Sequence, residues 1–205
     1  FAHFKKQLAK MQIAPQQIQY IFYDDHAGYL NEILSGCSDI QMIMSDKALE
    51  RLYRGQNSFH GGCTTKIALF FCSLMKFVGK GKHLFPPIKQ EYSCRCIQVT
   101  KQNRKQMELL LQGKIIDTPG HTADSISLLL NDGSLFCGDA AMNGLPSLHR
   151  ITIWAEDKTA FLKSWETIIA HRPNLIYPGH GKPFGYDDLK TNLKRAKNMK
   201  LLPIY

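Results

Sequence analysis

The chain of 205 residues is long enough for one domain with a sizeable core and short for two domains. Hydrophobic residues make up 44% of it and charged residues 21%, a balance that is ordinary for a soluble globular protein. Its apolar runs fall far short of the roughly 20 residues that a membrane-spanning helix needs, so no membrane partner is expected. We therefore predict a single domain over residues 1–205.

The net charge of +9 brings nucleic acid into consideration as a partner, but the basic residues are spread along the chain. The lysines of 190–200 lie at helical spacing, which is more typical of a solvated helix face than of a binding patch. Residues 1–11 form a lysine-bearing amphipathic pattern and not a signal peptide, so the expected location is cytoplasmic. The six cysteines include no Cys-x-x-Cys pair and are expected to be reduced thiols, since Cys94-x-Cys96 alone is a weak zinc signal.

The first half of the chain predicts helices that alternate with strands. The first expected helix covers residues 1–11, with Phe1, Phe4, Leu8 and Met11 along one face. A second expected helix contains Leu30, Ile33 and Leu34 and stops at Gly36, and a third contains Leu49 and Leu52. Ser45 or Asp46 is expected to cap the third helix. The expected strands are 18–22 and 40–44. Residues 56–92 predict a helix followed by a loop that walls a substrate cleft.

In the second half, the pattern changes to strands joined by turns. The expected strands are 96–99, 114–117, 125–130, 134–137 and 175–177. Asn131, Asp132 and Gly133 predict a hairpin between the third and fourth of these strands. A helix is expected around Phe161, Trp165, Ile168 and Ile169, and a last helix from about residue 187.

Two polar side chains follow strands at glycine turns. Pro119 and Gly120 break the chain just before His121, and Asp139 comes directly after the apolar run that ends at Cys137. Histidine and aspartate on stiff elements, with room for an ion, are the ligands that a metal site needs. We therefore predict that His121 and Asp139 bind metal, and that Cys137 is a core residue beside them.

Three separated motifs share one family likeness. They are Asp25-His26-Ala27-Gly28, the stretch from Thr118-Pro119-Gly120-His121-Thr122 to Asp139, and Tyr177-Pro178-Gly179-His180-Gly181. In sequence and order they resemble the metallo-β-lactamase superfamily. The resemblance implies a fold of the α/β (α+β) class, the αββα sandwich, with metal ligands at strand ends along one edge. That family begins with β-strands ahead of the first helix seen here, so the chain is expected to start inside the domain.

The resemblance also implies two divalent metal ions and their ligands. Asp25, His26 and His180 would hold one ion, His121 would help to hold a second, and Asp139 would bridge the two. Zinc is the expected metal, with iron or manganese as alternatives, because imidazole and carboxylate ligands suit all three. Such an ion lowers the pKa of bound water to about 7, and Asp25 would orient the resulting hydroxide for catalysis while ligating.

The first motif departs from the family pattern, which is Thr-His-x-His-x-Asp-His. Ile21 and Tyr23 stand five and three residues before His26, where the family has histidines. Two explanations stay open. Either the protein is a degenerate or single-metal member, or a segment such as Thr-His-x-His is absent between Tyr23 and Asp24. The second explanation fits the flanking residues better, and only one ion is expected if the histidines are truly absent.

The resemblance implies a metal-dependent hydrolase that uses metal-bound hydroxide on a small ester, thioester or lactone, as in the glyoxalase II-like branch. The alternatives are an RNA-processing nuclease, prompted by the basic charge, and a non-catalytic protein on the same scaffold. The expected partner is a small-molecule substrate, and the oligomeric state is open. His60 is a weak candidate for substrate binding, and Tyr23, Asp24 and Asp124 are candidates for hydrogen bonds that position ligands.

Overall fold

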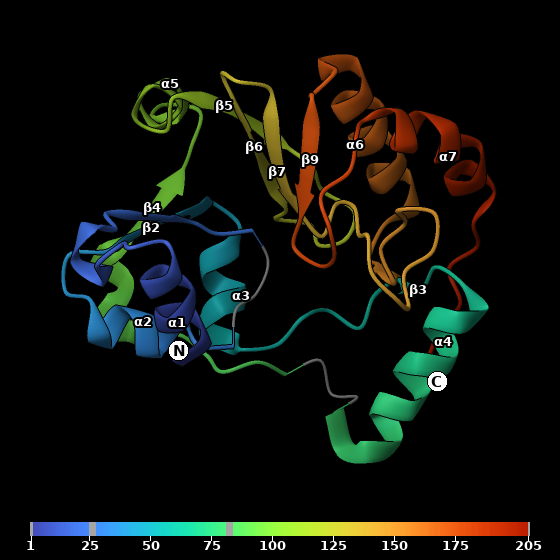
Figure 1. Ribbon diagram of the computed structural model, residues 1–205. Helices are drawn as coiled ribbons and strands as arrows, with labels where there is room; N and C mark the ends of the chain where they lie inside the picture. The colour runs from blue at the N-terminus through green and yellow to red at the C-terminus, as the bar shows by residue number, and fades with distance from the viewer. Residues whose placement is uncertain (1, 25–27, 81–83, 205) are drawn as a thin grey trace.

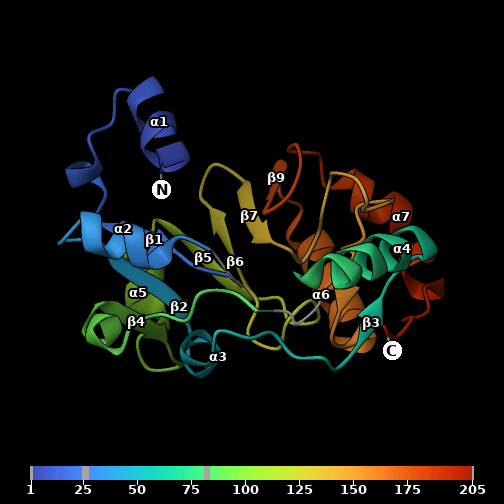
Figure 2. The ribbon, with the colours of Figure 1, turned by 90° about the horizontal axis from the view of Figure 1, so that it is seen from below.

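The computed structural model describes residues 2–24, 28–80 and 84–204 (Figure 1). Two β-sheets form the middle of the molecule, and helices cover the outer face of each (Figures 1 and 2). This order of layers is the αββα sandwich that the sequence predicted.

The first sheet is parallel, with the strand order β1-β2-β4. Its strands are β1 (Tyr20–Phe22), β2 (Gln41–Ser45) and β4 (Cys96–Val99). The helices that accompany it are α1 (Ala2–Lys10), α2 (Leu30–Gly36) and α3 (Ala48–Arg54). Leu34 of α2 and Leu52 of α3 pack in one cluster with Met42 and Met44. The three central residues of β2 are all apolar, because the strand is covered on both faces.

The second sheet has the strand order β5-β6-β7-β9. Its strands are β5 (Gly113–Asp117), β6 (Ile126–Leu130), β7 (Ser134–Gly138) and β9 (Leu175–Pro178), and only the β7–β9 pair is parallel. The helices α6 (Lys158–His171) and α7 (Asp187–Asn198) cover its outer face. Phe161, Trp165 and Ile168 of α6 are fully buried, and the Trp165 indole donates a hydrogen bond of 2.8 Å to the carbonyl of Ala140.

A third apolar cluster lies between the two sheets. Ile43 and Val99 come from the first sheet, and Ile115, Ile126 and Leu128 come from the second. Met107 of α5 (Arg104–Leu110) closes the cluster at one end. The strand ends that carry the predicted ligands therefore lie on rigid, packed elements.

The remaining elements lie beyond the sandwich. A two-stranded sheet pairs β3 (Gly62–Cys63) with β8 (Trp154–Ala155), and 3₁₀-helices cover Pro15–Gln17 and Gln90–Arg95. The helix α4 (Lys66–Met75) begins at Thr65, whose hydroxyl accepts a hydrogen bond from the Ala68 N–H, and continues as a π-helix over Lys76–Lys80. It projects from one end of the molecule (Figures 1 and 2). Over the described ranges, no helix is long and apolar enough to cross a membrane.

Most of the predicted helices and strands are confirmed, with three corrections. Met11 is 66% exposed, so the buried side of the first helix ends at Leu8. Neither Ser45 nor Asp46 caps α3, because the helix begins after Lys47 without a side-chain cap. The helix α5 was not predicted, since three successive leucines over 109–111 hide its helical period.

Candidate metal centre

Asp139 is held at the end of β7 by a second aspartate. Its backbone N–H donates a hydrogen bond of 3.1 Å to Oδ2 of Asp24, and its side chain is almost fully buried. The other oxygen of Asp24 accepts the N–H of Ile126, also at 3.1 Å. Asp24 thus links the residues after β1 to two strands of the other sheet, and it fixes the backbone that carries Asp139.

The turn after β5 directs His121 toward the same point. Gly120 has a φ of +135°, and a Cβ there would lie 2.3 Å from the backbone nitrogen of Phe161, so only glycine fits. The His121 Nδ1 lies 2.8 Å from the carbonyl oxygen of Trp154 and 3.2 Å from Oγ1 of Thr152. A carbonyl can only accept, so Nδ1 carries the hydrogen and Nε2 is the nitrogen left to bind a cation. That Nε2 lies 3.8 Å from Oδ2 of Asp139.

His180 reaches the other side of the same carboxylate. Its Nδ1 lies 2.8 Å from Oδ1 of Asp139. The parallel pairing of β7 and β9 explains the meeting, because the carboxyl ends of paired parallel strands lie at one edge of the sheet. A Cβ on Gly179 would lie 2.9 Å from the Asp139 oxygen, so a glycine before His180 allows this approach.

One buried carboxylate therefore lies between two imidazoles. Nε2 of His121 and an oxygen of Asp139 face each other at 3.8 Å, and both are groups that bind a metal ion. Imidazole and carboxylate groups suit zinc, iron and manganese. In the part of the chain that the structure describes, no group of three or more His, Cys, Asp or Glu side chains is arranged to hold a metal ion. Asp25 and His26 lie outside the described residues, so the ligand set stays a prediction.

A cavity of about 420 Å³ opens onto the three side chains. Its other walls are mainly apolar and include Phe71, Cys72, Met75, Phe85, Leu145 and Trp154. Residues 56–92 supply one of these walls, as the sequence predicted. Glu156 also lines the cavity, where burial raises the pKa of its carboxyl group and the N–H of Ala123 donates to it at 2.9 Å. The site is thus a polar point at the end of an apolar cavity.

The structure places the candidates for supporting roles, which are Tyr23, Asp24, His60 and Asp124, in different surroundings. Asp24 makes the positioning hydrogen bonds described above, whereas Asp124 is buried in an ion pair with Arg51, at 3.1 Å between the arginine Nε and each carboxylate oxygen. Tyr23 packs in the core of the first sheet. His60 is exposed and is not among the residues that line the cavity, so the structure gives no support to its role in substrate binding. Cys137 is buried, as predicted for a core residue, and burial raises the pKa of its thiol.

Three groups beside His121 were not predicted from the sequence. They are the carbonyl of Trp154, the hydroxyl of Thr152 and the carboxyl of Glu156, and all three come from the segment around β8. A backbone carbonyl leaves no signal in a sequence. The polar residues after Ile151 were the only feature of the sequence that could have indicated these contacts, and we predicted no helix or strand in that segment.

The contact between Gly138 and Asp24 leads to a prediction about stability. Gly138 has a φ of +51°, and a Cβ there would lie 1.6 Å from Oδ2 of Asp24. We expect Gly138→Ala to lower the free energy of unfolding by at least the roughly 1–2 kcal/mol that a left-handed backbone costs an L-residue. Gly185→Ala is the matched control, because nothing lies within 4 Å of its Cβ. Equal urea midpoints for the two variants would contradict the prediction.

Comparison with known proteins agrees with this architecture. No protein-family model matches the chain. A curated relative from Drosophila melanogaster, described as a beta-lactamase-like protein 2 homolog, is 31% identical over 96 residues. Those residues are 45% of this chain and 31% of the relative, so the match spans about a third of the relative's length.

Solved structures match over most of the chain. An archaeal metallo-β-lactamase superfamily protein from Sulfolobus tokodaii is 18% identical, with a TM-score of 0.54 over 86% of this chain and 67% of its own. The metallo-β-lactamase FIM-1 from Pseudomonas aeruginosa, in its mono-zinc form, is 14% identical, with a TM-score of 0.58 over 96% of this chain and 73% of its own. A protein solved in a di-iron-bound form is 14% identical, with a TM-score of 0.58 over 93% of this chain and 82% of its own. These likenesses confirm the predicted fold.

Proposed function

We propose that this chain, which has the metallo-β-lactamase fold, acts as a metal-dependent hydrolase of a small ester, thioester or lactone. One observation carries the proposal: Nε2 of His121 faces the buried Asp139 carboxylate across 3.8 Å at the end of a 420 Å³ cavity. A mainly apolar cavity of this size suits an acyl group, and the polar end suits its carbonyl.

The metal would be held by His121, Asp139 and His180, together with Asp25 and His26. A bound divalent ion supplies Lewis acidity, which polarises a carbonyl and lowers the pKa of coordinated water. We propose zinc, with iron or manganese as alternatives, and two ions if the histidines of the first motif exist in the whole protein. One ion is proposed if they do not.

The chain's own groups prepare the site. The carbonyl of Trp154 holds the hydrogen on Nδ1 of His121, which leaves Nε2 directed at Asp139. Outer partners of this kind orient a ligand and raise its basicity. Asp24 fixes the backbone of Asp139, and the apolar wall contributed by α4 keeps bulk water from the acyl group. The substrate carbonyl would thus meet groups that need no rearrangement.

Hydrolysis tests the proposal. The chain, loaded with zinc, is offered an aryl ester, a short acyl thioester and a γ-lactone. We expect hydrolysis of at least one of them, its loss after chelation and its return with added zinc. We expect His121→Gln to lower kcat/KM by about 100-fold or more, the loss typical of removing one preorganised charge-stabilising group. Hydrolysis that survives both chelation and this variant would contradict the proposal.

His171→Gln is the matched control, because His171 lies at the end of α6 and is not among the cavity residues. We expect it to leave hydrolysis unchanged. The same preparation separates the alternatives. RNA binding that weakens steeply with salt would favour the nuclease. Folded protein from metal-supplemented medium that holds no stoichiometric zinc, iron or manganese would favour the non-catalytic protein.

A further inference from the structure

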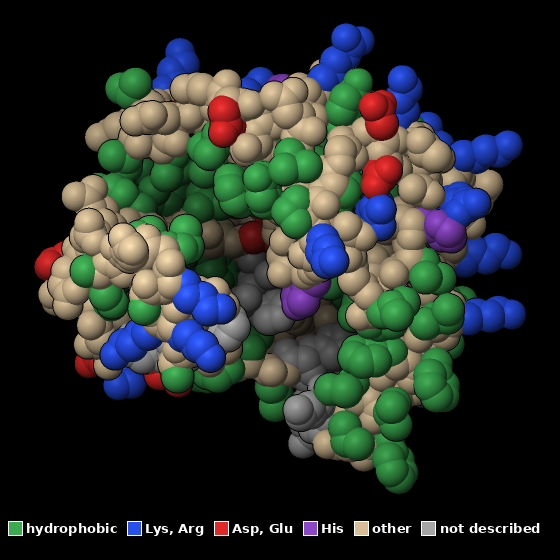
Figure 3. Space-filling view, viewed as in Figure 1, with side chains coloured by type: hydrophobic (Ala, Val, Ile, Leu, Met, Phe, Trp, Pro, Cys, Tyr) green, Lys and Arg blue, Asp and Glu red, His purple; other side chains and the backbone are tan. Residues whose placement is uncertain are grey.

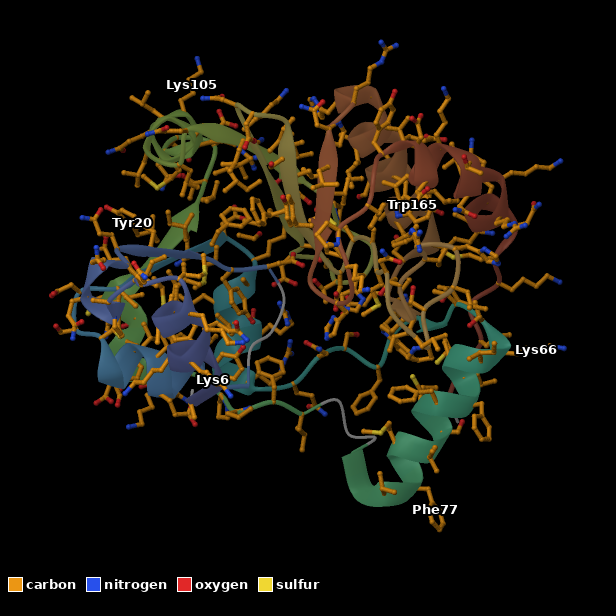
Figure 4. The ribbon with its side chains drawn as sticks, in the orientation of Figure 1. Lys6, Tyr20, Lys66, Phe77, Lys105 and Trp165 are labelled. Atoms are coloured by element: carbon orange, nitrogen blue, oxygen red, sulfur yellow. The ribbon has the colours of Figure 1, made fainter. Side chains whose placement is uncertain are left out.

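The helix α4 directs apolar side chains away from the molecule. They are Ile67, Phe70, Leu74, Phe77 and Val78, which we call the outer face of α4 and which includes the π-helical turn. Phe70 is 72% exposed and Phe77 is 89% exposed. Hydrophobic side chains cover this end of the molecule in Figure 3, and Phe77 lies at the far tip of the helix in Figure 4. A contiguous exposed apolar surface of this kind marks an interaction site.

The opposite side of α4 is apolar as well. Ala68 is buried, and Cys72 and Met75 line the cavity that leads to His121 and Asp139. A helix that is apolar all round is normally buried on every side. Folding of this chain covers only the inner side of α4, so the outer face still has apolar area to bury against something else.

The charge around α4 indicates what that partner is. Over residues 52–90 the sequence has six Lys or Arg residues and no Asp or Glu. Lys66, at the beginning of α4, is exposed, and so is Lys76, which directly follows the helix and also lines the cavity. Lysines that flank an apolar helix face are typical of helices that lie in the interface of an anionic membrane.

We propose that the outer face of α4 binds the surface of an anionic phospholipid membrane. The apolar side chains would enter the boundary between headgroups and acyl chains, and the lysines would contact the anionic headgroups. The helix would lie on the membrane and not cross it. The sequence-based expectation of no membrane partner rested on the lack of a spanning segment and did not consider a helix that lies flat. The proposal does not depend on the hydrolase function.

Vesicle cosedimentation with the full chain tests the proposal. The two probes are vesicles of phosphatidylcholine alone and vesicles in which about a third of the lipid is phosphatidylserine. We expect binding to the anionic vesicles and little to the neutral ones. The double variant Phe70→Asp and Phe77→Asp should lower the partition coefficient by more than about ten-fold, since each buried Phe contributes a large apolar area. Lys66→Glu alone should lower it by about five-fold or more, the factor expected for one lysine near the surface.

Met11→Asp and Leu109→Asp together form the matched control. Both residues are exposed and apolar, at 66% and 81%. Met11 directly follows α1 and Leu109 lies in α5, and both helices are far from α4 (Figure 1). We expect this control to bind vesicles like the unmodified chain. Equal losses in the two double variants, or no binding to anionic vesicles, would overturn the proposal. A second copy of the chain could instead cover the face. That outcome, which would overturn the proposal, is a dimer in light scattering that the double variant Phe70→Asp and Phe77→Asp dissociates, with no binding of the unmodified chain or the variant to vesicles.

Discussion

Asp139→Asn is expected to abolish hydrolysis while the protein stays folded. The substitution keeps the shape of the side chain and removes the negative charge that faces both imidazoles, His121 at 3.8 Å and His180 at 2.8 Å. Loss of an outer partner of a metal ligand costs 10- to 100-fold in affinity or activity. We expect the loss of Asp139, as a ligand itself, to exceed about 100-fold in both kcat and zinc affinity.

The measurement combines kcat for the best substrate with zinc affinity from competition with a chelator. Asp132→Asn is the matched control, since that aspartate lies on the exposed hairpin. The one hydrogen bond described for its side chain is from the N–H of Ser134. We expect the control to leave both quantities unchanged. If Asp139→Asn retained full zinc affinity, Asp139 would not be a ligand, and the proposed arrangement would be wrong.

Asp124→Ala is expected to cause the largest loss of stability. The ion pair between Asp124 and Arg51 is buried, with side-chain exposures of 4% and 7%. Removing the carboxylate leaves the guanidinium buried with Asn57 as its remaining described polar contact. Breaking a buried pair from one side costs about 3–5 kcal/mol. For a chain of this length we expect Tm to fall by roughly 6–20 °C.

Urea unfolding provides the free energies for this comparison. Asp117→Ala is the control, because its side chain is 65% exposed and its ion pair with Arg104 should contribute at most about 1 kcal/mol. The double variant Arg51→Met and Asp124→Leu should recover much of the loss, since apolar groups of similar volume can replace a buried pair. A loss for Asp124→Ala that is no larger than for Asp117→Ala would contradict the account.

The layers of the fold could be predicted because local patterns and the family resemblance agreed. Trp165 and Ile168 follow the helical period and are buried in α6, and the turn Asn131-Asp132-Gly133 joins two strands as expected. The strand predicted over 40–44 is likewise present as β2 (Gln41–Ser45). In each case the signal lies within a few residues of the element it predicts.

The site could be predicted only in part, because its supporting contacts are distant in sequence. Asp24 accepts a hydrogen bond from the backbone of Asp139, which lies 115 residues further along the chain. His121 contacts the backbone carbonyl of Trp154, and the identity of a residue does not reveal which contacts its backbone makes. The outer face of α4 was hidden for a different reason. An apolar stripe in a sequence is the same whether it packs inside the protein or faces outward, so periodicity alone does not distinguish the two.

The most direct test of the account is the metal content of the whole protein, purified from zinc-supplemented cells without chelator. We predict at least about one equivalent of bound metal per chain, lowered by His121→Gln and unchanged by His171→Gln. Imidazole and carboxylate ligands hold zinc tightly enough for this content to survive purification. A folded protein that holds less than about a tenth of an equivalent, and takes up none when zinc is added, would contradict the proposed metal centre and the hydrolase function that depends on it.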